Sequence, residues 1–147
     1  MLQANNDLHS NIKQIQSIVP AAIGANATKT GAIHDRQGYG GVEFIASYGS
    51  VTTTGTVVTL VMKEGDVTGT MTSVADADML GTEALASLLA ATPRTAGTTK
   101  EVAKRLGYKG TKRYVQILAV QTGVTSVGCV SVNAILFNPN QVPVSNP

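Results

Sequence analysis

The C-terminal third of the chain contains two strand-length runs, residues 113–121 and 127–137, in which apolar side chains fall on both faces. A strand that faces water on one side usually alternates apolar and charged residues. From Tyr114 to the C-terminus, however, there is no Asp, Glu, Lys or Arg. The pattern predicts a hairpin that is covered on both sides. It is either the centre of a sandwich core or a hairpin with a subunit interface on its outer face.

Alternation of apolar and polar residues predicts further strands at residues 42–48, 56–64, 67–74 and 100–106. Residues 82–91 form the best helix candidate, because Thr82 can cap its start and Pro93 stops it. The leucines of this candidate fall on one stripe: Leu85, Leu88 and Leu89. Strands and helices do not alternate. These features predict an all-β fold, an antiparallel β-sandwich or jelly roll with one short helix insert and an extended N-terminal arm.

The chain divides into an N-terminal arm at residues 1–23, a β-sandwich domain at 24–138 and an extended C-terminal tail at 139–147, which holds three prolines. Leu8, Ile12, Ile15 and Val19 recur at helical spacing. The same stretch also fits a strand with Ile15 and Val19 on one face and Ile12 and Ile18 on the other. Periodicity does not decide between helix and strand over so short a window.

Composition narrows the class of protein. The chain has 147 residues, enough for one domain with a sizeable core, and 43% of them are hydrophobic. Charged residues make up 14%, against about 25% in typical soluble domains. A low-charge chain rich in Thr, Val and Gly is typical of an all-β assembly protein. The single cysteine, Cys129, excludes an internal disulfide, and its apolar strand predicts a buried structural thiol.

Charge is distributed unevenly along the chain. Residues 94–113 hold seven Lys or Arg and one acid, a net charge of +6, while the remainder has a net charge of −4. Bases alternate with apolar residues here, which favours a solvated strand face or a contact with an acidic partner over a nucleic-acid site. No apolar run is long enough to span a bilayer, and we see no signal peptide, so we expect no membrane partner.

Residues with catalytic or metal-binding chemistry are few. His9 and His34 are the two histidines, and no nucleophile elbow accompanies His34 and Asp35. Asp76 and Asp78 lack the rest of a calcium loop. The glycines near residue 40 are not followed by the Lys-Ser/Thr pair of a phosphate loop. With no Trp and few other aromatics, sugar and single-strand nucleic-acid platforms are also scarce. We therefore expect no enzyme, cofactor, metal, nucleic acid or small-molecule substrate.

Several short motifs follow one another in a fixed order along the chain. An N-terminal NIKQIQSIVPA precedes GYGGVEFIASYG and an Ala-Asp-x-Asp stretch. The turn GYKGTKRYV, a Gly-Val-Thr loop and the ending AILFNPNQVP follow. The chain departs from this pattern at EALASLLAATPRTAG, where a plainer loop would be expected. Together these motifs, which span most of the chain, resemble the small virion structural proteins of tailed bacteriophages.

The resemblance implies a capsid decoration or cement protein that binds the major capsid protein on the capsid exterior, made in the host bacterial cytoplasm. Such proteins are homo-oligomers, with a trimer favoured, and an arm or tail can add to a neighbour's sheet edge. Six residues in the arm and the basic turn are the predicted capsid or subunit interface: Ile12, Ile15, Ile18, Lys109, Lys112 and Arg113.

Three alternatives belong to other classes. A tail or head–tail connector component would assemble into rings or tubes. A receptor- or glycan-binding module would use Tyr39, Tyr48 or Tyr108. A hydrolase would need His34 and Asp35 to share a cleft with a nucleophile.

Overall fold

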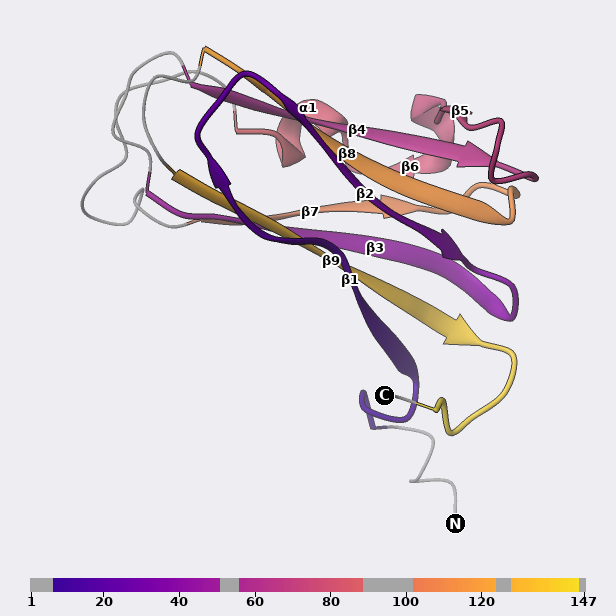
Figure 1. Cartoon of the computed structure of the whole chain (residues 1–147). Helices are drawn as coiled ribbons and strands as arrows, with labels where there is room; N and C mark the ends of the chain where they lie inside the picture. Colours follow the sequence, from indigo (N-terminus) through magenta and orange to yellow (C-terminus); the bar gives the residue numbers. More distant parts are fainter. Residues whose placement is uncertain (1–6, 51–55, 89–101, 124–127, 146–147) are drawn as a thin grey trace.

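The computed structural model is a sandwich of two antiparallel sheets, described for residues 7–50, 56–88, 102–123 and 128–145 (Figure 1). The first sheet has the strand order β1-β9-β3-β7-β6, with β1 at Ile12–Ile23, β9 at Gly128–Pro139, β3 at Tyr39–Tyr48, β7 at Val102–Tyr108 and β6 at Met79–Leu80. The second has the order β2-β8-β4-β5, with β2 at Thr28–Asp35, β8 at Tyr114–Thr122, β4 at Val57–Gly65 and β5 at Thr72–Ser73. The predicted all-β sandwich is confirmed.

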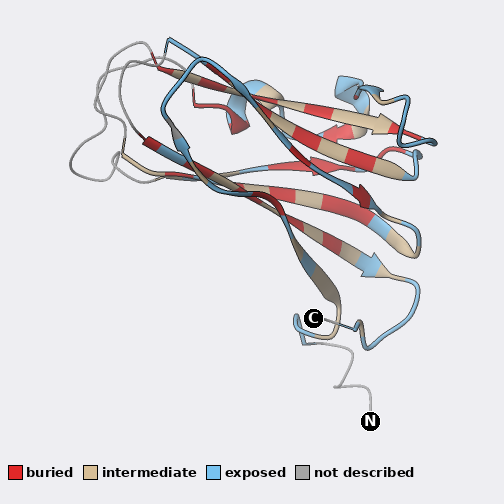
Figure 2. Ribbon diagram, viewed as in Figure 1, coloured by how far each residue is buried: buried red, intermediate tan, exposed pale blue. Residues whose placement is uncertain are grey.

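The core lies between the two sheets and follows the alternation in the sequence. Buried residues alternate with more exposed ones along β3, β4, β8 and β9 (Figure 2). The inner faces meet through fully buried aliphatic and aromatic side chains, among them Phe44, Leu60, Met62, Ile117 and Leu136. Period-two burial therefore places one face of each central strand in the core, and leaves the opposite face partly open.

The predicted C-terminal hairpin is wrong. β8 pairs with β2 and β4, while β9 pairs with β1 and β3, so the two runs belong to different sheets. Their inner residues, such as Ile117 and Val132, both belong to the core between the sheets. Alternation specifies which face of a strand is buried, but it does not specify the neighbouring strand. A connection between two sheets leaves the same local pattern as a hairpin.

The predicted N-terminal arm forms an edge strand, β1, which pairs with β9. Register shifts between Gln16 and Ile18, and again between Ile18 and Ala21, break the simple alternation. As a result Ile18 is buried in the core and Ile15 packs against it, while Val19 is 65% exposed. The strand alternative is confirmed, but its two faces were assigned wrongly because a β-bulge moves every later side chain to the other face.

The helix is shorter than predicted. α1 spans Glu83–Ala86, and the Thr82 hydroxyl accepts a hydrogen bond from the Leu85 N–H at 3.1 Å, as the predicted cap requires. After Ala86 the chain is extended, and Leu88 exchanges two backbone hydrogen bonds with Val58 of β4. Leu88 is therefore buried while Leu85 is 72% exposed, so these two leucines do not share a stripe. Leu89 and Pro93 lie outside the described residues.

Other boundaries differ from the predictions. β2 and β6 were missed, because β2 is rich in polar residues and β6 has only two residues. The strand predicted at residues 67–74 is reduced to the two residues of β5. Cys129 is exposed, which contradicts the predicted buried thiol, because it lies opposite Ala22 on the outer face of the first sheet.

Candidate interaction surfaces

The basic turn that joins β7 to β8, residues 109–113, is built around the buried Tyr108. The Tyr108 hydroxyl donates a hydrogen bond to the Glu64 carboxylate and accepts one from the Lys112 N–H at 3.0 Å. Gly110 passes so close that an added Cβ would lie 2.4 Å from the Tyr108 hydroxyl oxygen. Only a glycine allows the backbone to cross the tyrosine at this distance. The buried side chain of Tyr108 therefore fixes the conformation of this turn.

Arg36 also stabilises this turn. Its guanidinium donates hydrogen bonds to the carbonyl oxygens of Lys112 at 2.5 Å and Gly110 at 2.6 Å, and lies 5.3 Å from the centre of the Tyr108 ring. Burial and the hydrogen bond to Glu64 raise the pKa of Tyr108 well above its usual value. Tyr108 therefore remains a neutral donor across the physiological range. The turn is a fixed platform for the bases that it carries.

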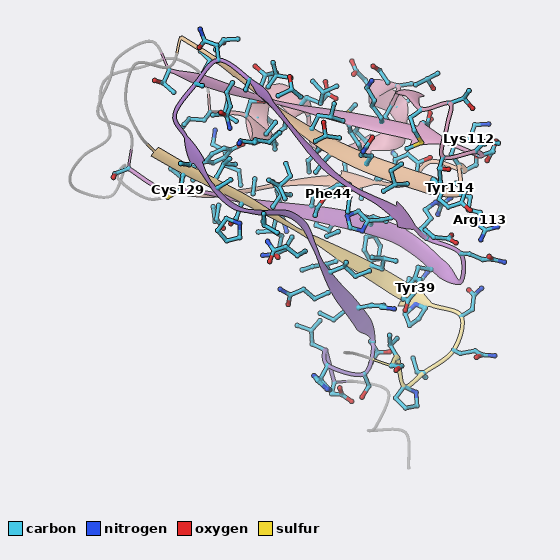
Figure 3. All side chains as sticks on the ribbon, in the orientation of Figure 1. Tyr39, Phe44, Lys112, Arg113, Tyr114 and Cys129 are labelled. Atoms are coloured by element: carbon cyan, nitrogen blue, oxygen red, sulfur yellow. The ribbon has the colours of Figure 1, made fainter. Side chains whose placement is uncertain are left out.

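Two of these bases are paired within the chain. Lys112 Nζ lies 2.6 Å from a carboxylate oxygen of Asp66, and Arg113 Nη2 lies 2.6 Å from one of Asp35. The two bases are labelled in Figure 3. The hydrogen bonds from the bases lower the pKa of both carboxyls. All four side chains are substantially open to water, so salt screens the pairs. Much of the positive charge near residue 113 is thus compensated locally by acids from distant parts of the sequence.

The six predicted interface residues do not form one cluster. Lys109 is exposed and makes no ion pair with any described residue. Ile12 is half-buried beside Phe137 on the outer face of the first sheet. Ile18 is 4% exposed and belongs to the core of its own chain. In the strand order, β9 and β3 separate β1 from β7, so the arm and the basic turn are two separate surfaces. Their role in an interface stays a prediction.

The outer faces of both sheets carry few charged side chains. The distribution of charge along the sequence did not reveal this feature. Within the strand residues, Glu43 and Arg105 are the charged side chains on the outer face of the first sheet, 3.8 Å apart. Burial raises the pKa of Glu43. On the outer face of the second sheet the charged side chains are Asp35 and Lys63, near one end. The centre of that face is aliphatic and hydroxylic, with Val57, Thr59, Val61, Leu118, Val120 and Thr122. We call this set the second-sheet outer face.

The residues of the hydrolase alternative do not meet. His34 is 3% exposed, its Nε2 has no hydrogen-bond partner among the described residues, and its ring centre lies 5.8 Å from that of Phe44. Burial lowers the pKa of His34. Asp35, the next residue along β2, is exposed and paired with Arg113. Neighbouring residues of a strand point to opposite sides, so this His and Asp share no cleft.

The three tyrosines proposed for a glycan site differ in the burial of their side chains. Tyr48 and Tyr108 are buried in the core, and the Tyr48 hydroxyl donates to the carbonyl oxygen of Ala86 at 2.9 Å. Tyr39 is partly buried and lines a groove near the end of β9. Of the three, Tyr39 alone has a side chain that a ligand could reach.

No family model and no curated protein matches this chain. Among solved structures, it is similar to the PBSX exported protein XepA, with 16% identity and a TM-score of 0.53. A structure from the Gx strain of infectious bursal disease virus matches with 9% identity and a TM-score of 0.50. Each match covers 90% of this chain, which spans 39% and 34% of those two proteins respectively.

A third similar structure comes from the capsid of the Helicobacter pylori bacteriophage KHP30, with 15% identity and a TM-score of 0.45. It covers 89% of this chain and 95% of that chain. At such low identities the likeness concerns the fold alone. The β-sandwich fold of this chain also occurs in XepA and in the infectious bursal disease virus structure.

Proposed function

We propose that this chain is a non-enzymatic virion structural protein of a tailed bacteriophage, a decoration or cement protein that binds the major capsid protein on the outside of the head. The observation that carries the proposal is the scarcity of charge on the two outer faces of the sandwich. The sequence resemblance supports it, and so does the occurrence of the same fold in a viral structure.

The second-sheet outer face has the chemistry of a contact surface. An antiparallel sheet that faces water normally carries polar and charged residues there. Here Val61, Leu118 and Val120 occupy its centre, and each is half-buried in the isolated chain. Covering such side chains stabilises a complex by about 25 cal/mol per Å² of apolar surface removed from water. A specific interface needs about 800 Å² on each partner.

Sheet faces suit this role better than sheet edges. Both long edge strands are irregular: β1 has two register shifts and Pro20, and β2 has a shift between Thr30 and Ile33. Bulges and proline on edge strands discourage the addition of a further strand. Association through faces therefore replaces the addition of an arm to a neighbour's sheet edge as the expected mode of contact.

The proposal assigns a partner to each surface. The second-sheet outer face packs on further copies of this chain in a homo-oligomer, with a trimer favoured. The exposed Lys109 and the half-buried Ile12 contact the major capsid protein. Lys112 and Arg113 contribute less to this contact, because their charges are already paired with Asp66 and Asp35. Many equivalent weak contacts around the head then act together by avidity.

The test is co-sedimentation of the purified protein with expanded capsids of its parent virus that lack this protein. Saturable binding at a stoichiometry that matches capsid symmetry sites is expected. Lys109→Glu should weaken this binding. Leu118→Lys should lower the fraction of the protein that is in the oligomer, measured by analytical ultracentrifugation. Leu85→Lys is the matched control, because Leu85 is 72% exposed and belongs to α1, which is part of neither the second-sheet outer face nor the basic turn.

Absence of binding to capsids would overturn the decoration role. If the protein then forms rings or tubes by electron microscopy, the tail or connector alternative takes its place. An oligomer that tolerates Leu118→Lys unchanged would refute the role of the second-sheet outer face.

A further inference from the structure

A polar groove of about 560 Å³ lies where the segment after β9 folds back beside the turn between β2 and β3. Its lining includes Lys13, Gln37, Tyr39, Asn140 and Gln141. In Figure 3 the labelled Tyr39 lies beside the end of β9, where β1 and β9 extend away from the second sheet. Ligand pockets in proteins range from about 300 to 1,000 Å³, so this groove has the size for one or two sugar residues.

Backbone hydrogen bonds fix the walls of the groove. The Asn140 N–H donates to the carbonyl oxygen of Gly38 at 2.8 Å, and the Val144 N–H donates to that of Ser10 at 2.9 Å. The turn itself is closed by the Tyr39 N–H, which donates to the carbonyl oxygen of Arg36 at 2.9 Å. Gly38 has a φ of 89°, which favours glycine. The C-terminal segment is thus tied to the turn and to the start of β1, and the groove is preformed.

The polar side chains of this groove are not used by the protein itself. Gln37, Asn140, Gln141 and Lys13 make no side-chain hydrogen bond or ion pair with any described residue. An amide can donate and accept at once, which suits the paired hydroxyls of a sugar. The half-buried ring of Tyr39, flanked by prolines, supplies an apolar surface for the C–H face of a sugar ring.

A second, smaller hollow of about 310 Å³ adjoins the groove across the same turn. It shares residues 37–39 with the groove and adds Arg36, Thr111 and Arg113. The lining of the two hollows therefore contains three cationic side chains and no acid. The guanidinium of Arg36 is occupied by carbonyl oxygens and that of Arg113 by Asp35, so Lys13 is the cation without a partner among the described residues.

We propose that this groove binds an acidic saccharide chain, with Tyr39 packed against one sugar ring, the amides of Gln37 and Asn140 bound to its hydroxyls, and Lys13 paired with a carboxylate. The saccharide extends across the turn between β2 and β3, so that a second carboxylated sugar lies near Arg36 and Arg113. Nucleic acid fits less well, because successive bases need several aromatic rings to stack on and this site has one. Lys109 and Ile12, the main residues proposed for capsid contact, do not line either hollow, although Arg113 of the basic turn lines the smaller one. The site would give the virion affinity for a carboxylated surface polysaccharide.

The test uses three carboxylated probes: trigalacturonic acid, an oligoguluronate and sialyllactose. Each is titrated into the full-length protein and followed by amide chemical shifts. The methyl ester of trigalacturonic acid keeps the sugar rings and removes the charge, so it measures what the carboxylates contribute. We expect saturable shifts at Gln37, Tyr39 and Asn140 with at least one acidic probe, and weaker binding of the ester.

Three variants separate the contributions. Lys13→Gln should weaken binding of the acid about tenfold, as expected for loss of one charge-assisted contact, and leave binding of the ester unchanged. Asn140→Ala should weaken both, because the amide binds hydroxyls in either probe. Lys29→Gln is the matched control, since Lys29 also lies on an edge strand but does not line the groove, and it should bind like the wild type.

Absence of shifts at the groove with all three acidic probes at millimolar concentration would overturn the proposal. So would equal binding of the acid and its ester, or equal losses in Lys13→Gln and Lys29→Gln. Lys109 does not line the groove, so Lys109→Glu should weaken sedimentation with capsids and leave saccharide binding unchanged. Failure of the decoration role and failure of the saccharide site therefore give different results.

Discussion

Replacing Tyr108 with phenylalanine tests whether one hydroxyl holds the basic turn in place. The substitution keeps the buried ring and removes the oxygen that bonds both the Glu64 carboxylate and the Lys112 N–H. Tyr108 is fully buried, so water has limited access to the groups left behind. The expected effect is on the stability of the fold and on the order of residues 109–113.

The magnitude follows from the two hydrogen bonds. The bond to a charged carboxylate contributes about 1.5–3 kcal/mol, and the bond from a backbone N–H about 0.5–1.5 kcal/mol. Because Glu64 and Lys112 are not fully buried and recover some water contacts, a loss of about 2–3 kcal/mol is expected. For a chain of this length that corresponds to a fall in Tm of roughly 5–10 °C.

The assay is urea unfolding of the wild type, Tyr108→Phe, Glu64→Gln and the double variant. The double-mutant cycle isolates the coupling between the hydroxyl and the carboxylate, which should be about 1–2 kcal/mol. Tyr48→Phe is a useful comparison, since its buried hydroxyl donates to a neutral carbonyl and should contribute less. Tyr108→Phe with a loss below about 0.5 kcal/mol, or additive single effects, would refute this account of the turn.

Three further predictions concern other positions. Gly31→Ala should destabilise the fold by about 1–3 kcal/mol in urea unfolding, because the added Cβ would lie 2.6 Å from the Ile117 carbonyl oxygen; a neutral effect would show that β2 is free to shift. The lowered pKa of His34 means that the unfolded chain binds more protons below about pH 6.5, so stability should be complete above that pH and fall below it by up to about 1.4 kcal/mol per pH unit. His34→Phe should flatten the stability profile between about pH 7.5 and 5.5, and an unchanged slope would contradict this origin. Cys129 should react with a maleimide in the folded protein, and mass spectrometry measures the labelling. Labelling that requires denaturant would contradict the exposure of this thiol.

The candidate surfaces were only partly accessible to sequence reasoning. The basic turn was identified from its charges, but the partners of Lys112 and Arg113 are Asp66 and Asp35, which are 46 and 78 residues away along the chain. Pairing over such separations depends on which strands end beside one another. Sequence therefore located the bases correctly but overstated the free charge that they present.

The groove beside Tyr39 was missed as a site, although Tyr39 was named as one of three tyrosines that could bind a glycan. Its lining comes from the start of β1, the turn before β3 and the segment after β9. No local pattern links these segments. A weak signal was present in the Asn, Gln and Pro residues of the C-terminal tail, which has no apolar periodicity and so is available for a surface role.

By itself, the sequence determined the class of fold and which residues of a strand share a face, because alternation acts locally at a period of two. It left open which face of β4, β8 and β9 is buried, because both faces carry apolar residues. It also determined where α1 begins, because the Thr82 cap is a local bond. Only the tertiary structure decided that β8 and β9 lie in different sheets, that bulges in β1 bring Ile18 to the core and leave Val19 exposed, and that Cys129 is exposed. These outcomes depend on which strands pair and in what register, and strand pairing is a long-range choice that minimises exposed apolar area over the whole chain.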